Sequence, residues 1–172
     1  NTAGPNSYAL ASGRDNQASG AYSLAAGRVN VSSGTYSMTL GHGNQATATS
    51  STAIGHYSVV SGTYATALGL NNTASSSFTT AIGPEARSLN TSAMTFGIDI
   101  SANETKSFVI GTGISKFSGF RLENDISNSL MIGFNTTEPT FFVRSADQTI
   151  SAPGKVGIGT TETPNTLSDG TD

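Results

Sequence analysis

Glycine recurs at every fourteenth position over more than half of the chain, and this spacing constrains the fold more than any other feature of the sequence. Eight of the 20 glycines share one register, and they are Gly13, Gly27, Gly41, Gly55, Gly69, Gly83, Gly97 and Gly111. A fixed period of this kind indicates a repeat fold in which each repeat is one structural unit. Helical repeats need more than about thirty residues, and a high content of Ser, Thr, Gly and Asn also disfavours long helices.

Side chains alternate in size along the residues before each glycine, which is typical of a strand with two unlike faces. In one repeat Met38 and Leu40 are large, whereas the intervening Thr39 is small. A second small residue follows each repeat glycine seven positions later, as at Gly20, and indicates a second turn. We therefore predict two short strands in each repeat, with φ > 0 at both small-residue positions. The expected fold is all-β, a parallel β-solenoid (β-roll) of 14-residue coils stacked about 4.8 Å apart.

The larger members of these alternating positions form an apolar ladder along the repeats. Its members are Leu24, Met38, Leu40, Ile54, Leu68, Ile82, Phe96 and Ile110. A flattened coil has a thin interior that suits Ala and Ser, but the alternation does not say which face points inward. In either arrangement a single rod leaves one ladder facing water, and an apolar patch of that length marks an interface. The sequence therefore predicts an oligomer.

A family resemblance rests on the segments Tyr64-Ala65-Thr66-Ala67-Leu68-Gly69 and Thr79-Thr80-Ala81-Ile82-Gly83. They are similar to the head repeats of YadA-like trimeric autotransporter adhesins, which read roughly as S-x-A-I-G, and the similarity covers residues 7–111. The resemblance implies a left-handed β-roll, a homotrimer and an extracellular position on a bacterial surface fibre. It also implies a host glycan or matrix protein as a partner. Ser12 and Ala26 depart from the pattern, because the family has Ile or Leu before the glycine.

The repeat register breaks after Gly111, because the next matching glycine is Gly133 rather than a residue one period further on. The wider spacing implies an eight-residue insertion. Sixteen of the 19 charged residues follow residue 83, and solenoids need more polar ends that stop edge-to-edge growth. We expect three regions, namely a β-roll over 1–111, an insertion or connector over 112–130, and a C-terminal β cap and tail over 131–172. An apolar plug is predicted from Phe117, Phe120, Phe134, Phe141 and Phe142.

The last part of the chain resembles a second kind of segment. Residues 154–161 are similar to a short module of phage tail fibres and bacterial surface-fibre shafts. The chain begins at Asn1 rather than Met, which favours a processed or excised piece of a secreted product.

The composition excludes several classes of function. Eight scattered Lys and Arg residues and a net charge of −3 cannot supply a phosphate-binding groove, so we expect no nucleic-acid partner. No run of 18 apolar residues exists, so no membrane span is expected. The chain has no Cys, which excludes thiolate catalysis and thiolate zinc sites. Since no carboxylate pair has a histidine partner nearby, we predict no enzymatic activity and no cofactor.

The two histidines, His42 and His56, each follow a repeat glycine and are therefore one repeat apart. They are expected to stack in adjacent coils, close enough to share a metal ion. Without a carboxylate close in sequence, we favour exposed turn residues and predict no metal site.

An aromatic residue precedes most repeat glycines by five positions, and Ser50 interrupts the series. The series comprises Tyr8, Tyr22, Tyr36, Tyr64 and Phe78. It is either an adhesive stripe for glycans or matrix proteins, or a stack that stabilises the rod, and we favour the stack. Thr52, Thr66 and Thr80 share a register, as on an ice-binding face, but larger residues interrupt that array on both sides.

These patterns together predict a structural or adhesive surface-fibre protein whose trimeric β-roll head mediates attachment or fibre assembly. Three alternatives stay open. They are a self-polymerising extracellular filament subunit that stacks head to tail, a phage tail-fibre segment that recognises a receptor, and an ice-binding solenoid.

Overall fold

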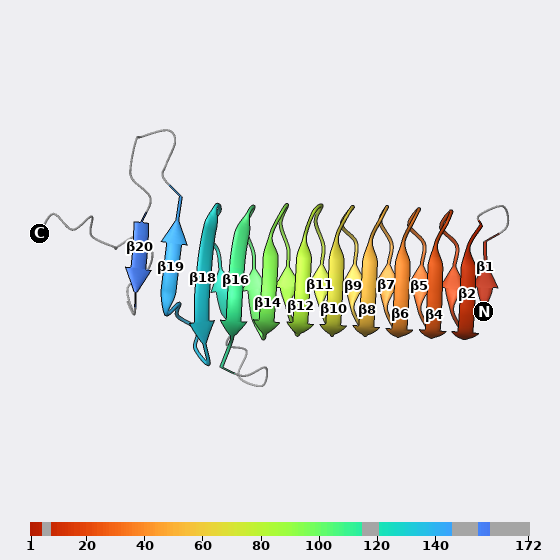
Figure 1. Cartoon of the computed structure of the whole chain (residues 1–172), viewed down its shortest axis with the longest axis horizontal. Coiled ribbons are helices and arrows are strands. Elements are labelled where there is room, and N and C mark those ends of the chain that lie inside the picture. Colours follow the sequence, from red (N-terminus) through yellow and green to blue (C-terminus); the bar gives the residue numbers. More distant parts are fainter. Residues whose placement is uncertain (5–7, 115–120, 146–154, 159–172) are drawn as a thin grey trace, which may run out of the picture.

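The computed structural model of the chain describes residues 1–4, 8–114, 121–145 and 155–158. These residues contain strands and turns but no helix, and the strands stack into a straight rod with β1 at one end and β20 at the other (Figure 1). The predicted all-β parallel solenoid is therefore confirmed.

Each coil of the rod contributes one long and one short strand. The long strands are β2 (Leu10–Arg14), β4 (Leu24–Arg28), β6 (Met38–His42), β8 (Thr52–His56), β10 (Thr66–Leu70), β12 (Thr80–Pro84), β14 (Met94–Ile98), β16 (Ser107–Thr112) and β18 (Ser129–Phe134). The short strands are β1 (Thr2–Ala3), β3 (Gln17–Ala18), β5 (Val31–Ser32), β7 (Gln45–Ala46), β9 (Val59–Val60), β11 (Thr73–Ala74), β13 (Arg87–Ser88), β15 (Ile100–Ala102) and β17 (Leu122–Asn124). Odd-numbered strands from β1 to β17 form one sheet, and even-numbered strands from β2 to β18 form the other.

The 14-residue period of the sequence sets the register of both sheets, because paired residues are 14 positions apart in most coils. Thr66 pairs with Thr80 and Leu68 pairs with Ile82 in parallel strands, so equivalent residues of successive coils lie side by side. Backbone N–H groups donate to the next coil, as Thr66 N does to Thr79 O at 2.9 Å. Because these bonds run along the rod, the backbone polar groups are satisfied with little need for a large core.

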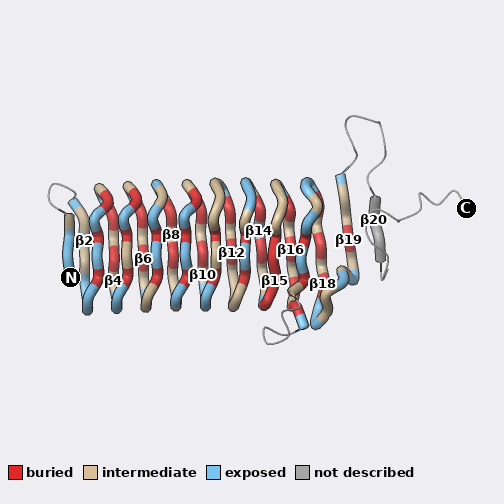
Figure 2. The backbone as a smooth tube through the Cα atoms, turned by 180° about the vertical axis from the view of Figure 1, so that it is seen from behind, coloured by how far each residue is buried: buried red, intermediate tan, exposed pale blue. Residues whose placement is uncertain are grey.

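Small side chains fill the space between the two sheets. Ala53, Ala67 and Ala81 on the long strands are fully buried, as are Ala46 and Ala74 on the short strands. Figure 2 shows the buried positions recurring along the rod in every coil. The structure thereby decides which face points inward, because the small residues are inside and the large apolar ladder is outside.

The turns differ in part from the prediction. The repeat glycines have positive φ, from 105° at Gly13 to 151° at Gly97, as predicted. Gly20 lacks a positive φ, so the prediction for the second small position is wrong. Gly20 instead permits close approach, since a Cβ there would lie 2.0 Å from the carbonyl oxygen of Gly34. The left-handed residues of this turn lie elsewhere, as at Tyr22 with a φ of 58°.

The coil after β16 is longer than the others. Gly111 pairs with Gly133 and Ile100 pairs with Leu122, so both sheets continue in register across this wider step. The additional residues lie between β16 and β17, and residues 115–120 fall outside the described part of the chain.

The C-terminal end of the long-strand sheet changes direction. The strands β19 (Phe141–Arg144) and β20 (Lys155–Ile158) are antiparallel to their neighbours, whereas all earlier pairs are parallel. Phe142 is buried, but Phe134 is 65% exposed and therefore does not belong to the predicted plug. Phe117 and Phe120 lie outside the described residues, as do residues 159–172, which include part of the fibre-shaft module.

Candidate interaction surfaces

The outer side of the long-strand sheet carries a continuous row of large apolar side chains, here called the apolar face. The apolar face comprises Leu24, Met38, Leu40, Ile54, Leu68, Ile82, Phe96 and Ile110, all of which are half-buried. Leu40, Ile54 and Leu68 are direct register partners in successive coils. At the C-terminal end the rings of Phe96 and Phe108 meet edge to face, with centroids 5.6 Å apart. Members of the apolar face in successive coils therefore pack against each other along the rod, whereas their outer sides are exposed to water.

The outer side of the short-strand sheet has a different character. Its strand positions carry Gln17, Gln45, Thr73 and Arg87, with the half-buried Val31 and the exposed Val59 as apolar exceptions. Ser and Thr predominate two residues further on in each coil. The two outer faces of the rod are thus unlike, and the long-strand side is the one that would gain from being covered by another chain.

The five residues of the aromatic ladder, namely Tyr8, Tyr22, Tyr36, Tyr64 and Phe78, line up along one turn of the coils. Ring centroids are 5.5 Å apart between Tyr8 and Tyr22, and 5.1 Å apart between Tyr22 and Tyr36. Tyr64 and Phe78 stack at 5.4 Å, and all three pairs lie within 10° of parallel. Every ring is more than half exposed, from 53% at Tyr22 to 85% at Tyr8. The ladder is therefore both a stack between coils and an aromatic surface that solvent reaches.

Every residue of the aromatic ladder has a left-handed backbone conformation. The φ angles run from 44° at Tyr8 to 61° at Phe78. Such angles are uncommon for residues other than Gly, Asn and Asp, and a bulky side chain is disfavoured there. Ring stacking between coils, typically about 0.5–1.5 kcal/mol for each pair, offsets part of this cost.

The two histidines lie side by side at the end of β6 and β8. His42 and His56 are register partners, and Nε2 of His56 lies 2.9 Å from Nδ1 of His42 in a hydrogen bond. The ring of Tyr57 packs against both, at 5.0 Å from His42 and 4.3 Å from His56. Within the described residues, no group of three or more His, Cys, Asp or Glu side chains could hold a metal ion.

A spine of asparagines runs through the interior, and the sequence reasoning missed it. Asn16, Asn30, Asn44 and Asn72 are buried three residues after a repeat glycine. Oδ1 of Asn16 accepts from the backbone N–H of Asn30 at 3.0 Å, and Oδ1 of Asn30 accepts from that of Asn44 at 2.9 Å. Each side chain thus hydrogen-bonds the backbone of the next coil.

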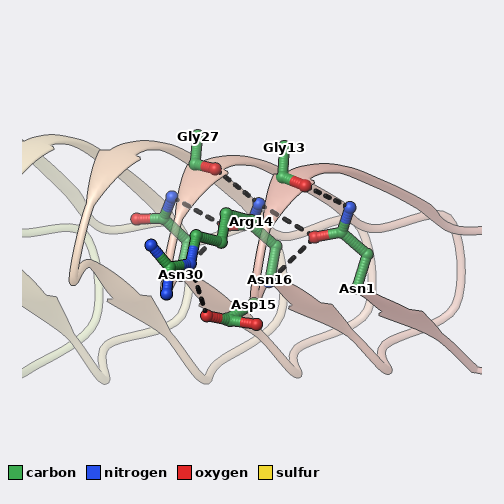
Figure 3. A network of polar contacts seen from close by, with 7 residues as sticks. All are labelled: Asn1, Gly13, Arg14, Asp15, Asn16, Gly27 and Asn30. Atoms are coloured by element: carbon green, nitrogen blue, oxygen red, sulfur yellow. Dashed lines mark hydrogen bonds and ion pairs between the residues drawn. The ribbon is translucent and has the colours of Figure 1, made fainter.

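The side-chain amide of each spine residue also bridges two coils. Nδ2 of Asn16 donates to Ser12 O at 2.6 Å. It also donates to Gly27 O at 2.8 Å, as Figure 3 shows. Asn1 continues the spine at the N-terminal end, since its Oδ1 accepts from the backbone N–H of Asn16 at 3.0 Å. The available signal was the spacing of these asparagines, which is one repeat or a multiple of it from Asn16 to Asn72. The spine has a structural role, because its side-chain polar atoms form hydrogen bonds that connect neighbouring coils.

Several of the described acidic residues contact side chains and backbone of other coils. Asp99 and Glu85 share a half-buried Arg121, whose Nη1 donates to Glu85 O at 2.6 Å and whose Nη2 lies 3.5 Å from Glu85 Oε2. Nη1 of Arg121 also lies 4.0 Å from Asp99 Oδ1. Asp125 accepts a hydrogen bond from Asn103, and Glu104 accepts one from Ser127. These carboxylates therefore hold the long coil to its neighbours.

Comparison with known proteins bears on the repeats. A family model described as the YadA head domain repeat (two copies) matches residues 4–28, 32–58 and 61–86. Neither the comparison with curated proteins nor the one with solved structures gives a match. In the part of the chain that the structure describes, no helix is suited to crossing a bilayer. Sequence resemblance, coil register and family match agree, so the coils over residues 4–28, 32–58 and 61–86 are similar to YadA head domain repeats.

Proposed function

We propose that this chain is the head segment of a homotrimeric, extracellular surface fibre with a structural and adhesive role and no catalytic activity. The YadA head domain repeats support this proposal, because the family they define is one of cell-surface adhesins. Regular coils with few charges and continuous hydrogen bonds give a stiff spacer on which a surface can be displayed.

The apolar face is the observation that carries the proposal. The interior is already filled by small side chains, so Ile54, Leu68 and the other members of this face add nothing to a core within one chain. Identical rods that place these faces together would form a shared apolar core, as in other obligate homo-oligomers. Three chains then repeat each surface feature three times, which strengthens weak contacts through multivalency.

Solution mass after size exclusion tests the trimer. Light scattering should give three times the 17.5 kDa of one chain. The double variant Ile54→Ser/Leu68→Ser should lower this mass, whereas Val59→Ser on the other sheet should leave it unchanged. If monomeric chains do not stay folded, the unfolding midpoint of the unaltered protein should rise with protein concentration.

Two outcomes would contradict this proposal in different ways. A monodisperse monomer whose unfolding midpoint does not depend on concentration would exclude the apolar face as an interface. Long fibres in electron micrographs would instead favour the head-to-tail filament subunit.

A further inference from the structure

The aromatic ladder has one gap, where Ser50 occupies the ring position between Tyr36 and Tyr64. The backbone there is undisturbed, because the φ of Ser50 is 55° and those of Tyr36 and Tyr64 are 58° and 57°. Ser50 N donates to Thr35 O at 2.8 Å, and Tyr64 N donates to Thr49 O at 3.1 Å, so the coil spacing continues through the gap. A single ring is therefore missing from an otherwise regular stack.

Two aromatic faces border this gap. Tyr36 stacks on Tyr22 with one face, and Tyr64 stacks on Phe78 with one face, so each has its second face turned along the rod toward the gap. Tyr36 and Tyr64 are two coils apart, which is about 9.6 Å. A ring placed midway would lie about 4.8 Å from each wall, which is within the range of roughly 4.5–7 Å for stacked rings.

The floor of the gap is polar. Ser50 supplies a hydroxyl there, and the adjacent Thr49 is exposed. Neither hydroxyl forms a hydrogen bond with any of the described residues, and the same is true of the phenol groups of Tyr36 and Tyr64. The gap thus combines two apolar walls with hydroxyl groups that can donate and accept at its floor and rim.

We propose that this gap, here called the Ser50 notch, binds one pyranose ring of a glycan. A pyranose has apolar C–H faces, which suit the two tyrosine walls, and a rim of hydroxyls, which suit Ser50 and Thr49. A purely aromatic side chain would fill the walls equally well but would leave the hydroxyl at the floor without a partner, which is costly when water is displaced. A few polar groups within an aromatic-lined site are also the usual means of orienting a small ligand.

The left-handed turn belongs to every coil, since Ser50 and Ser92 share it, but a bulky side chain at this position is disfavoured by it. Exposed tyrosines contribute nothing to the interior, yet Tyr36 and Tyr64 both occupy the left-handed region. The notch rests on the proposed adhesive function and specifies its ligand class, with three notches in a homotrimer.

Saturation-transfer NMR on the full chain tests the notch with the methyl glycosides of glucose, galactose, mannose and N-acetylglucosamine at millimolar concentration. At least one glycoside should receive saturation from the protein. Ser50→Tyr completes the aromatic stack and should weaken that binding at least tenfold. Ser92→Tyr is the matched control, because Ser92 occupies the same repeat position with a φ of 58° but lies beyond Phe78.

The aromatic walls require their own variants. Tyr36→Ala and Tyr64→Ala should each weaken glycoside binding about tenfold, whereas Tyr8→Ala at the far end of the ladder should not. The proposal is overturned if no glycoside binds, if Ser50→Tyr binds as well as the unaltered protein, or if p-cresol binds and the glycosides do not. Light scattering on the same samples separates this failure from failure of the trimer, because a trimer without glycoside binding would remove the notch alone.

Discussion

A left-handed backbone conformation recurs two residues after the repeat glycine, and the residues that occupy this position tolerate it unequally. Asp15 and Asn71 have φ angles of 56° and 58°, and their short polar side chains are among those that accept the region. Val29 has a φ of 55° although it is β-branched, and its side chain is 46% exposed. Packing therefore recovers little of the backbone cost at Val29.

Replacing Val29 by Asn should stabilise the protein. We expect a gain of about 1 kcal/mol, because Asn relieves the steric cost of the left-handed region and little apolar burial is lost. Val31→Asn is the matched control and should destabilise, since Val31 is half-buried in the extended strand β5. Thermal unfolding followed by circular dichroism compares the two, and an unchanged or lower midpoint for Val29→Asn would show that its side chain contributes packing.

At the scale of the element, the strands are connected by side-chain hydrogen bonds of the asparagine spine as well as by the backbone hydrogen bonds of the sheets. Asn44 links its own coil to the next one through three hydrogen bonds, because Nδ2 donates to Leu40 O at 2.9 Å and to Gly55 O at 2.8 Å, and Oδ1 accepts from Ser58 N at 2.9 Å. Ser58 takes the next place in the asparagine spine, and its Oγ accepts from Asn72 N at 3.2 Å. A serine can thus supply one of the three hydrogen bonds, namely the one that accepts from the backbone N–H of the next coil.

Removing the side chain of Asn44 should be costly. Asn44→Ala leaves buried backbone groups without partners, so we expect a loss of about 3 kcal/mol in the free energy of unfolding. Asn44→Ser should lose less, by analogy with Ser58, and Gln45→Ala should have little effect because Gln45 is exposed. Urea unfolding of the three variants provides the measurement. Equal midpoints for Asn44→Ala and Gln45→Ala would contradict the role assigned to the spine.

The strands and their faces could be predicted because periodicity encodes both. A 14-residue glycine period and alternating residue sizes, as in Met38-Thr39-Leu40, are sufficient to define a coil and its two sides. The inward direction of Thr39 was not predictable, since it depends on the distance between the sheets. The asparagine spine was missed because Asn is frequent in this chain and a hydrogen bond to the next coil leaves no local pattern.

The candidate surfaces were predictable to the same extent. Residues in one register of a solenoid must stack, so the members of the apolar face and the aromatic ladder follow from their spacing. The left-handed conformation of Tyr36 and Tyr64 was not foreseen, because turn propensity favours Gly or Asn at such positions. The consequence of Ser50 depends on ring orientation, which only the structure shows.

At the scale of the whole molecule, each coil contacts mainly the coils before and after it. β10 pairs with β8 on one side and with β12 on the other, and both pairs have the same offset of one repeat. The free energy of unfolding of such a rod is approximately a sum of contributions from the individual coils and from the interfaces between neighbouring coils. A complete coil can therefore be removed without changing the contacts among those that remain.

Deleting residues 57–70 should leave a folded rod. The deletion joins His56 to Asn71, so the left-handed residue Asn71 replaces Tyr57 and every later coil keeps its register. The β-sheet signal in circular dichroism and the oligomeric state should persist, with a rod shorter by about 4.8 Å. Glycoside binding at the Ser50 notch should persist, because Phe78 then takes the register position of Tyr64 and supplies the second aromatic wall.

Deleting residues 57–71 is the matched control, one residue longer. It joins His56 directly to Asn72 and removes the left-handed residue that turns the chain between the two strands. Either the turn cannot close, or the following strand slips by one residue and exchanges its buried and exposed faces. We expect this variant to be rapidly cleaved by protease, whereas the shorter deletion resists it. Equal resistance of the two deletions would show that contacts within coils, rather than the shared register, hold the rod together.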